Sequence, residues 1–343
     1  MKANSISPYW VAMPVMRNLI MLGARNEQEV AAICKAANIH PDDLNNIEMK
    51  VSLECNIAIM EALLQISGDA NIGLHLGEKA APPIIGQAGH LQQSSSDVLT
   101  AFKKTVYFTR TFTALYDFIY EEKEDEVLLY FEPVQLWNDI APESARHGVD
   151  IPFAAILNFI RVLSGRVVYP IRVLYRFSKV NDTSEHEKIF RRKPLFNKNC
   201  NCIVFKKSDL EVPILGYNPQ LNEIIENLLH EKLRTANEGV RLTAKVKEAI
   251  LGNYHYDFPQ LETIALALNM TPRTLQRKLQ EENTTYRELS DTIKFELASV
   301  LLKHNELSVA EIAYKLGYTE PGTFRKAFKQ WSGNTPLDYR DKA

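Results

Sequence analysis

The segment SVAEIAYKLGYTEPGTFRKAFKQWSG, residues 308–333, sets the architecture expected for the C-terminal third of the chain. Its first part has apolar residues at helical spacing after Ser308, and serine is a favoured N-cap residue. Glu311, three positions later, completes the pattern of a capping box. Gly317 follows where helices commonly end in a left-handed residue. These features predict a short helix that stops at a tight turn.

A second helix is predicted directly after this turn, with Thr319 as its N-cap. Phe324 and Phe328 lie four positions apart, so both face inward from one side of that helix. A short helix, a tight turn and a second capped helix make up a helix-turn-helix unit. We place this unit at about residues 308–332.

A similar pattern occurs earlier in the chain, at about residues 258–282. Thr271 occupies the position of an N-cap, and Pro272 that of the first helical residue. The copies align at an offset of 48 residues before the turn and 49 after it, pairing Ile264 with Ile312, Ala265 with Ala313, Leu275 with Phe324 and Leu279 with Phe328. One such pattern would also fit an ordinary helical hairpin, whereas two copies with matching caps favour two helix-turn-helix units.

Between the copies, Tyr286–Asn305 has apolar residues at helical spacing along its whole length. We therefore predict one long amphipathic helix of about 28 Å, at ~1.5 Å per residue. Such a helix would hold the second helices of the two units about one DNA turn apart, which is ~34 Å. Two reading helices would then enter successive major grooves of one duplex.

The second helix of each unit carries residue types that contact DNA. Arginine donates two hydrogen bonds to guanine, glutamine pairs in the same way with adenine, and lysine commonly contacts phosphates. These residues are Arg273, Gln276, Arg277 and Lys278 in the first unit and Arg325, Lys326 and Lys329 in the second. No acidic residue occurs from Pro321 to Trp331. The alternative interpretation is a basic face that contacts only solvent.

The first 230 residues are expected to form a mixed α and β domain. Apolar spacing predicts helices at 27–37, 51–66, 96–112, 152–163 and from 218 onward, and β-branched or aromatic runs predict strands at 126–132, 171–177 and 202–205. The small, polar stretch Thr235–Gly239 is the expected domain boundary. The predicted fold class is therefore an α+β domain, residues 1–235, followed by an all-α domain, residues 236–343, with two helix-turn-helix units joined by a long helix.

Length, composition and charge exclude several classes of protein. At 343 residues, 45% apolar and 24% charged, the chain is typical of a two-domain globular protein. No apolar run reaches the ~18 residues that span a bilayer, and the first residues form a poor secretory signal, so we expect a cytoplasmic protein without membrane contact. Residues 231–343 hold 17 basic and 15 acidic side chains, a net +2, and residues 1–230 hold the other 23 and 27, a net −4. The total number of cationic side chains therefore does not indicate DNA binding. Their clustering on the two predicted reading helices does.

Residues 240–340 closely resemble the DNA-binding domain of AraC/XylS-type bacterial transcription regulators. The second unit and the following residues match the family pattern through Ile312-Ala313, Gly317-Tyr318, Phe324, Phe328, Gly333, Thr335-Pro336 and Tyr339-Arg340. The first unit matches through Ile264-Ala265, Leu268, Thr274-Leu275-Gln276-Arg277 and Leu279. The resemblance implies that both units bind one DNA duplex.

The resemblance also implies which side chains read bases. They are Arg273, Gln276 and Arg277 in the first unit, and Pro321, Gly322, Thr323, Arg325 and Lys326 in the second. With Thr274, Lys278 and Lys329 they form the candidate DNA-binding set. Gly322 offers no side chain, so the second reader is expected to use its neighbours or the shape of the DNA. The connecting helix also departs from the family, which often has arginine where Lys294 stands.

The first 230 residues resemble the arabinose-binding-like effector and dimerisation domain of one subgroup of this family, through NIHPDDL, ISGDANIGLHLGE and FNKNCNCIVFKKSDLEVPI. The resemblance implies a bacterial homodimer that senses a small molecule. It also implies an activator that binds promoter DNA and contacts RNA polymerase. The sequence specifies neither the effector and its pocket nor the operator.

Two other functions are compatible with such helix-turn-helix units. One is a DNA-binding adaptor that senses no ligand. The other is a repair enzyme that accepts alkyl groups on cysteine, which needs an activated thiolate and a four-ligand zinc site. Cys34, Cys55, Cys200 and Cys202 lack that spacing, so we expect no metal, no cofactor and no enzyme activity. His75 is expected to be a packed or surface histidine and not a haem or metal ligand.

Overall fold

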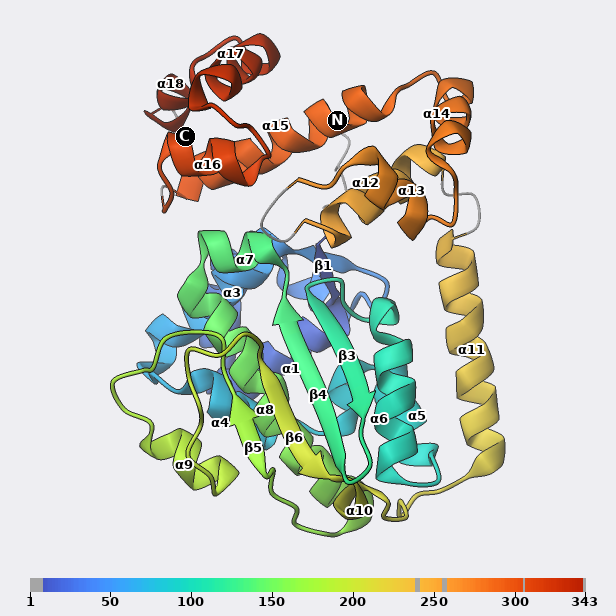
Figure 1. Cartoon of the computed structure of the whole chain (residues 1–343). Coiled ribbons are helices and arrows are strands. Elements are labelled where there is room, and N and C mark those ends of the chain that lie inside the picture. Colours follow the sequence, from blue (N-terminus) through green and yellow to red (C-terminus); the bar gives the residue numbers. More distant parts are fainter. Residues whose placement is uncertain (1–8, 238–240, 255–257, 305, 342–343) are drawn as a thin grey trace. The chain divides into compact units, whose positions relative to one another are not determined.

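The protein is described by a computed structural model that covers residues 9–237, 241–254, 258–304 and 306–341 (Figure 1). The chain divides into two compact units. Unit 1 consists of residues 1–133 and 143–236, and unit 2 consists of residues 134–142 and 237–343. Within the expected boundary Thr235–Gly239, helical structure continues to Asn237, and residues 238–239 lie outside the described residues.

Unit 1 combines two small sheets with many helices. Its strands are β1 (Trp10–Ala12), β2 (Lys50–Ser52), β3 (Tyr116–Glu122), β4 (Glu126–Pro133), β5 (Arg172–Leu174) and β6 (Cys202–Lys206). Its α-helices are α1 (Met13–Gly23), α2 (Glu27–Ala36), α3 (Leu53–Ser67), α4 (Ile72–Lys79), α5 (Gln87–Ser94), α6 (Val98–Tyr107), α8 (Pro142–Ser164), α9 (Ser184–Phe190), α10 (Lys207–Leu210) and α11 (Pro219–Asn237). Short 3-10 helices are η1 (Pro41–Asn45), η2 (Pro82–Ile85) and η3 (Thr109–Thr111).

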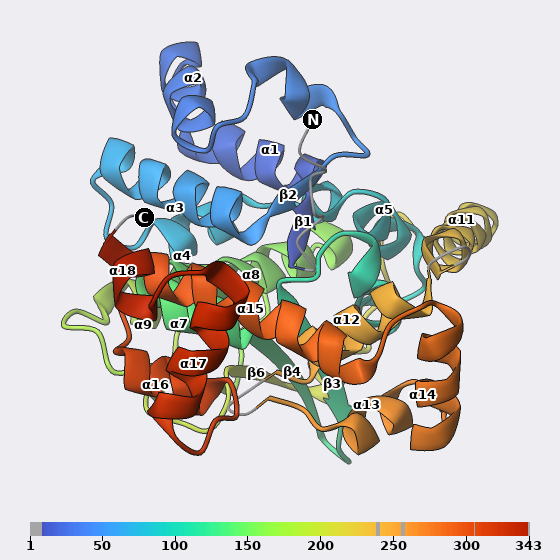
Figure 2. The ribbon, with the colours of Figure 1, turned by 90° about the horizontal axis from the view of Figure 1, so that it is seen from above.

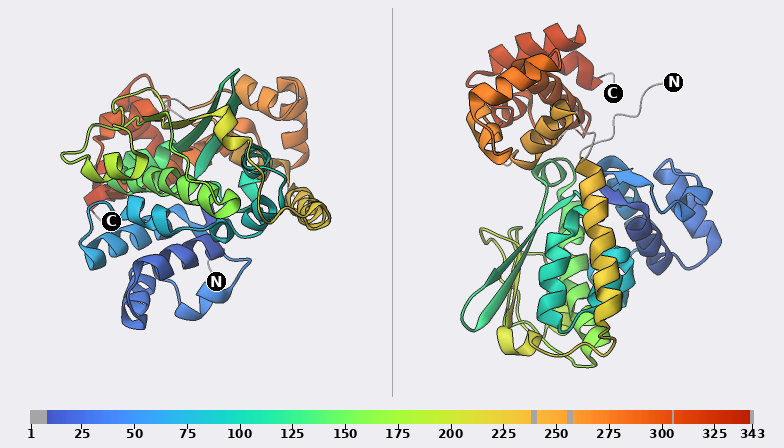
Figure 3. Two further views of the ribbon diagram at one scale, coloured as in Figure 1. Left: turned by 90° about the horizontal axis from the view of Figure 1, so that it is seen from below. Right: turned by 90° about the vertical axis from the view of Figure 1, so that its right-hand side faces the viewer.

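The larger sheet has the strand order β3-β4-β6-β5, and every neighbouring pair is antiparallel. In its register Phe118 lies opposite Phe131, and Leu128 lies opposite Val204. Four of the five residues of β6 are buried, as expected of an apolar strand with neighbours on both sides. Phe131 of β4 contacts Phe153 of α8 with ring centroids 5.7 Å apart, so α8 packs against this sheet (Figure 3).

Most predicted elements of unit 1 are present, with shifted ends. The predicted helix 51–66 is divided, because Val51 pairs with Val11 in the β1-β2 sheet and Ser52 then caps α3. The helix predicted from Pro152 begins ten residues earlier, at Pro142, so Pro152 lies inside α8. Proline lacks an N–H and is favoured in a first turn, which is why the sequence suggested a start at Pro152.

Helix α11 is fixed to unit 1 along one face. Asn222 is buried, and its Nδ2 donates to the Leu91 carbonyl at 3.1 Å. Lys104 donates to Asn222 Oδ1 at 2.5 Å and to Glu226 Oε2 at 2.7 Å. Leu229 is fully buried in a small apolar cluster with Leu91. These contacts hold α11 beside α5 and α6 (Figure 3).

No strand occurs in the described part of unit 2. Its helices are α7 (Gln135–Ile140), α12 (Leu242–Gly252), α13 (Leu261–Ala267), α14 (Pro272–Glu281), α15 (Tyr286–His304), α16 (Val309–Lys315), α17 (Pro321–Ser332) and α18 (Pro336–Asp341). Helix α15 is the predicted connecting helix, and α7, α12, α16 and α18 pack against it. The predicted fold class, a mixed α and β domain followed by a helical domain with helix-turn-helix units, is confirmed.

Candidate nucleic-acid interface

The first helix-turn-helix unit consists of α13 and α14. Asn269, two residues after the last residue of α13, has the left-handed conformation, with φ of 54°, and the N–H of the next residue donates to the Ala265 carbonyl at 2.8 Å. Thr271 caps α14 as predicted, because its Oγ1 accepts a hydrogen bond from the Thr274 N–H at 3.2 Å. Pro272 is the first helical residue. The local sequence therefore fixes where the reading helix begins.

The second unit, α16 and α17, repeats this turn. Gly317 takes the place of Asn269, with φ of 78°, and the N–H of Tyr318 donates to the Ala313 carbonyl at 3.0 Å. The predicted capping box is present: Ser308 Oγ accepts from the Glu311 N–H at 3.2 Å, and Glu311 Oε2 accepts from the Ser308 N–H at 2.7 Å.

The predicted N-cap at Thr319 is wrong. Helix α17 begins at Pro321 and is preceded by Glu320, whose side chain makes no capping hydrogen bond. The second turn is one residue longer than the first, and this residue lies before the N-cap. Pro321 therefore corresponds to Pro272 at the offset of 49, and Thr319 lies in the turn.

The apolar faces of the reading helices are fully buried, so their polar faces point outward. Leu275 and Leu279 of α14 have no exposed surface, and the same holds for Phe324 and Phe328 of α17. Ala265 and Ala313, at equivalent positions of the two units, are also fully buried, and their small side chains let the two helices of each unit approach closely. Figure 2 shows α14 near the N-terminal end of α15 and α17 toward its other end.

The candidate DNA-binding residues lie at the surface of both helices. On α14, Arg273, Gln276 and Arg277 are exposed and Thr274 and Lys278 are half-buried; on α17, Gly322, Thr323, Arg325, Lys326 and Lys329 are exposed and Pro321 is half-buried. Among the described residues, no carboxylate lies within ion-pairing distance of Arg273, Lys278, Arg325, Lys326 or Lys329. Five cations are thus available for an anionic partner, and their individual roles toward DNA stay predictions.

Arg277 differs from these cations because it has an acidic partner. Its guanidinium forms an ion pair with Glu281, one turn later on α14, and both side chains are exposed. Exposed pairs of this kind contribute little to stability, so the guanidinium can exchange Glu281 for another anionic partner at small cost. The pair also orients Arg277 along the exposed side of the helix.

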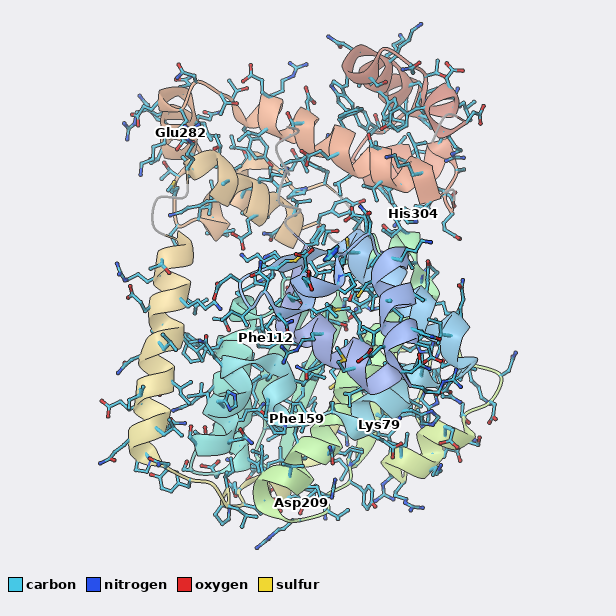
Figure 4. All side chains as sticks on the ribbon, turned by 180° about the vertical axis from the view of Figure 1, so that it is seen from behind. Lys79, Phe112, Phe159, Asp209, Glu282 and His304 are labelled. Carbon is cyan, nitrogen blue, oxygen red and sulfur yellow. The ribbon has the colours of Figure 1, made fainter. Side chains whose placement is uncertain are left out.

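Two side-chain contacts that the sequence did not predict tie the helices of unit 2 together. Glu282, labelled in Figure 4, follows α14 and accepts hydrogen bonds from the backbone N–H groups of Leu242 and Thr243 at 2.6 and 3.0 Å, which caps α12. Arg340 donates to the Leu307 carbonyl at 2.6 Å, next to the start of α16. No local pattern signals either contact, because the partners are 40 and 33 residues away.

The other candidate residues of the sequence lie in unit 1. His75 is half-buried, with Nδ1 2.6 Å from Asp69 Oδ2 and Nε2 3.3 Å from Glu185 Oε2. Burial lowers the pKa of His75, but the hydrogen bonds to Asp69 and Glu185 outweigh it and the pKa is raised. Burial also raises the pKa of Cys34, and it raises that of Cys202 to about 12, so neither thiol is activated.

Two kinds of site are absent from the described residues. Among them, no group of three or more His, Cys, Asp or Glu side chains is arranged to hold a metal ion. No helix in the described ranges has both the length and the apolar character needed to cross a membrane.

Comparison with known proteins identifies both parts of the chain. Residues 28–214 match the model of the arabinose-binding domain of AraC transcription regulator, N-terminal, and residues 264–342 match a helix-turn-helix domain. The chain is similar to the ornithine utilization regulator of Pseudomonas aeruginosa, with 25% identity over 316 residues that cover 90% of each chain. It is 37% identical over 79 residues, 23% of each chain, to the transcriptional regulator VirS of Mycobacterium tuberculosis. The crystal structure of the transcriptional regulator CdpR from Pseudomonas aeruginosa aligns with a TM-score of 0.45 at 22% identity, covering 92% of this chain and 97% of that one.

Proposed function

The chain belongs to the AraC family of transcription regulators, and from this premise we propose that α14 and α17 read two neighbouring major-groove segments of one promoter. One observation carries the proposal: two helix-turn-helix units, each with a reading helix whose apolar face is buried and whose cationic face is exposed, are joined by a single continuous helix, α15. That helix has 19 residues, or ~28 Å, close to the ~34 Å of one DNA turn.

The side chains divide into two roles. Arg273, Gln276 and Arg277, with Thr323, Arg325 and Lys326 of the second helix, read base edges. Lys278 and Lys329 lie further along each helix and contact phosphates, which position the protein without specifying sequence. Pro321 and Gly322 bring the backbone of α17 close to the DNA, and Thr274 stays part of the cap of α14 through its contact with Thr271 at 2.8 Å.

The experiment that tests this proposal selects bound sequences from random DNA and then compares two variants. Arg277→Ala should weaken binding to the selected site by ~1–3 kcal/mol, about 5- to 150-fold, and affect random DNA much less. Lys329→Ala should weaken binding to all DNA sequences alike. It should also reduce the slope of the logarithm of the binding constant against the logarithm of the salt concentration by about one. Affinities are measured by fluorescence anisotropy at several salt concentrations.

Glu281→Gln is the matched control for Arg277→Ala. It removes the ion-pair partner and keeps the guanidinium, so binding to the selected site should stay equal or become tighter. If Arg277→Ala weakened random and selected DNA equally, Arg277 would be a phosphate contact and not a base reader.

Unit 1 is proposed to sense a small molecule and thereby change the affinity for DNA. The match to an arabinose-binding domain model supports this proposal. A ligand that binds only the folded protein raises its melting temperature. A thermal-shift panel of sugars and amino acids, including arabinose and ornithine, should contain a stabilising compound. If no compound of a wide metabolite panel stabilised the protein, an adaptor without a ligand would be the better description.

We also propose that the protein acts as a homodimer through the outer face of α11. Leu221, Ile224 and Leu228 are 46%, 65% and 49% exposed, opposite the face fixed by Asn222. Exposed apolar patches of this kind commonly mark protein interfaces. Ile224→Glu should lower the mass measured by light scattering from dimer to monomer. Met21→Glu, at an equally exposed position of α1, should leave the dimer unchanged.

We further propose that the protein is located in the cytoplasm, where it activates transcription through contact with RNA polymerase. This proposal is supported by membership of the family and by the similarity to known transcriptional regulators. Transcription from a promoter that carries the selected site, with and without the protein, distinguishes an activator from a repressor.

A further inference from the structure

Lys294 lies in the middle of α15 and contacts an aromatic ring from each helix-turn-helix unit. Its Nζ is 4.6 Å from the ring centroid of Phe258 and 4.7 Å from that of Tyr318. Phe258 lies three residues before α13, the first helix of the first unit, and Tyr318 lies in the turn of the second unit. One ammonium group therefore connects two units whose ring residues are 60 positions apart in the sequence.

Tyr318 is coupled to the reading helix α17, and Phe258 lies next to a residue that is hydrogen-bonded to α15. The Tyr318 N–H closes the turn on Ala313, and its ring lies 5.6 Å from that of Phe324, which is fully buried under α17. Phe258 is buried, and the carbonyl of the next residue, Pro259, accepts a hydrogen bond from the Tyr286 hydroxyl at 2.9 Å. Tyr286 is the first residue of α15. A displacement of either unit around α15 would move its ring away from Lys294.

The attraction is large enough to matter for DNA recognition. A cation over an aromatic face is attracted by the ring quadrupole. Each such contact changes the equilibrium constant between the contacting and the separated arrangement by about two- to fivefold at partly exposed sites, and by more where water is excluded. Each base pair of B-DNA advances ~3.4 Å and turns by about one tenth of a full rotation. A change of one base pair in the spacing of the two segments therefore displaces one segment by ~3.4 Å along the duplex and by about one tenth of a rotation around it, which two units in a fixed relation cannot follow.

We propose that Lys294 is a positioning residue that fixes the angular relation between α14 and α17 and thereby sets the spacing of the two DNA segments the protein accepts. The inference rests on the proposed reading of two segments by one chain. Lys294 itself is not proposed to contact DNA. Its role is to make the two units a single rigid reader, so that a site with the wrong spacing cannot be bound by both helices.

The test compares Lys294→Met with the wild-type protein on three DNA duplexes. One carries the selected site, one has a single base pair inserted between the two segments, and one keeps only the segment read by α17. Methionine retains an apolar side chain of similar length and removes the charge. We expect the wild type to bind the selected site more tightly than the site with the inserted base pair. In Lys294→Met the ratio of these two affinities should be smaller by about fivefold or more. Binding to the single segment should stay within about twofold.

Three further variants separate positioning from simple stabilisation. Lys294→Arg keeps a cation over the rings and should retain the spacing preference. Phe258→Leu should reduce the preference in the wild-type background and have little added effect in Lys294→Met, as expected of two members of one contact. Lys303→Met changes an exposed lysine near the end of the same helix and should leave the preference unchanged.

The outcomes that overturn the inference are distinct. Two results for Lys294→Met would show that Lys294 contributes to stability only. One is an unchanged spacing preference, and the other is an equal loss of affinity for the single segment and for the full site. If Lys294→Met did not fold, Lys294→Arg and Phe258→Leu would still test the role of the cation. Because Lys294→Arg keeps the positive charge, a loss of spacing preference as large as that in Phe258→Leu would exclude this role. A wild type without any spacing preference would contradict the reading of two segments itself, and the assignment of Lys294 would fail with it.

Discussion

Gly322 lies in the first turn of α17, on the surface that is proposed to meet DNA. A Cβ atom added at this position would meet no heavy atom within 4 Å, and the backbone does not require a glycine there. The fold therefore gives no reason for glycine at this position. A close approach of the helix backbone to DNA is a reason, because any side chain would lie between them.

Replacement of Gly322 by alanine tests this interpretation. Gly322→Ala should stabilise the protein by up to ~1 kcal/mol, since alanine is a better helix former, and should weaken binding to the selected DNA. Gly252→Ala is the matched control, because Gly252 ends α12 and a Cβ there also meets nothing. Chemical denaturation and DNA titration are measured for both. DNA binding as tight as in the wild type would show that Gly322 does not approach the DNA closely.

Residues that act on neighbouring positions could be predicted from the sequence, and residues that act over distance could not. Thr271 and Ser308 were predicted as caps and confirmed, because a cap involves residues only three positions apart. The predicted N-cap at Thr319 was wrong because the length of a turn cannot be derived from residue preferences alone. The partner of Glu282 and the two rings of Lys294 were unpredictable, since only the packed helices bring them together.

At the scale of elements, α12 depends on a carboxylate that belongs to another helix. Glu282, directly after α14, accepts both of its backbone hydrogen bonds from the first turn of α12. The Thr243 N–H, joined by that of Leu242, holds the pKa of Glu282 below its usual range, although partial burial acts in the opposite direction. The ionised carboxylate also interacts favourably with the positive end of the α12 dipole.

This contact predicts a dependence of stability on pH. Because the pKa of Glu282 is lower in the folded than in the unfolded state, its contribution is present above the unfolded pKa of ~4.3 and is lost as pH falls through the folded value. Glu282→Gln should therefore destabilise the protein at pH 7 and have a smaller effect at pH 3. Urea unfolding at both pH values is the measurement. Glu281→Gln, at the neighbouring exposed carboxylate, should cause no comparable difference, and an equal effect of both variants would contradict the capping role.

The elements themselves were predicted where their periodicity was strong and unbroken. The connecting helix and both helix-turn-helix units have the expected positions, because their apolar residues recur at helical spacing between clear caps. The start of α8 was wrong because Pro152 lies within a helix that packing against the sheet maintains. Short strands such as β2 were not predicted, since three residues carry too little pattern.

At the scale of the molecule, unit 2 contains a segment that is distant in sequence. Helix α7 lies between β4 and α8 in the chain, belongs to unit 2 and packs against α15, and its Leu136, Trp137 and Ile140 are buried. Lys315 of α16 donates to Asp139 Oδ1 at 2.9 Å, and Asp139 is nearly buried. A DNA-binding fragment cut at the domain boundary expected from the sequence would lack all of these contacts.

The fragment 236–343 is therefore predicted to bind the selected DNA and to be less stable than unit 2 of the whole chain. It retains α14, α15 and α17, but it exposes the surface of α15 that α7 covers. Each large apolar side chain removed from water contributes about 1.5–3 kcal/mol, so the loss should be measurable. Hydrogen exchange should be faster at the backbone amides of Leu297–Leu302 in the fragment. Exchange at the same rate in both proteins would mean that α7 adds nothing to the stability of unit 2.

The sequence by itself determined the two helix-turn-helix units, the caps at Thr271 and Ser308, the long helix between the units and the cationic faces of α14 and α17. These features follow from interactions between residues three or four positions apart, which periodicity and residue type record directly. Only the tertiary structure decided that Glu282 caps α12, that α7 belongs to unit 2, and that Lys294 lies between Phe258 and Tyr318. Those contacts join residues that are tens to well over a hundred positions apart, and their partners are chosen by the packing of whole helices, which no local pattern encodes.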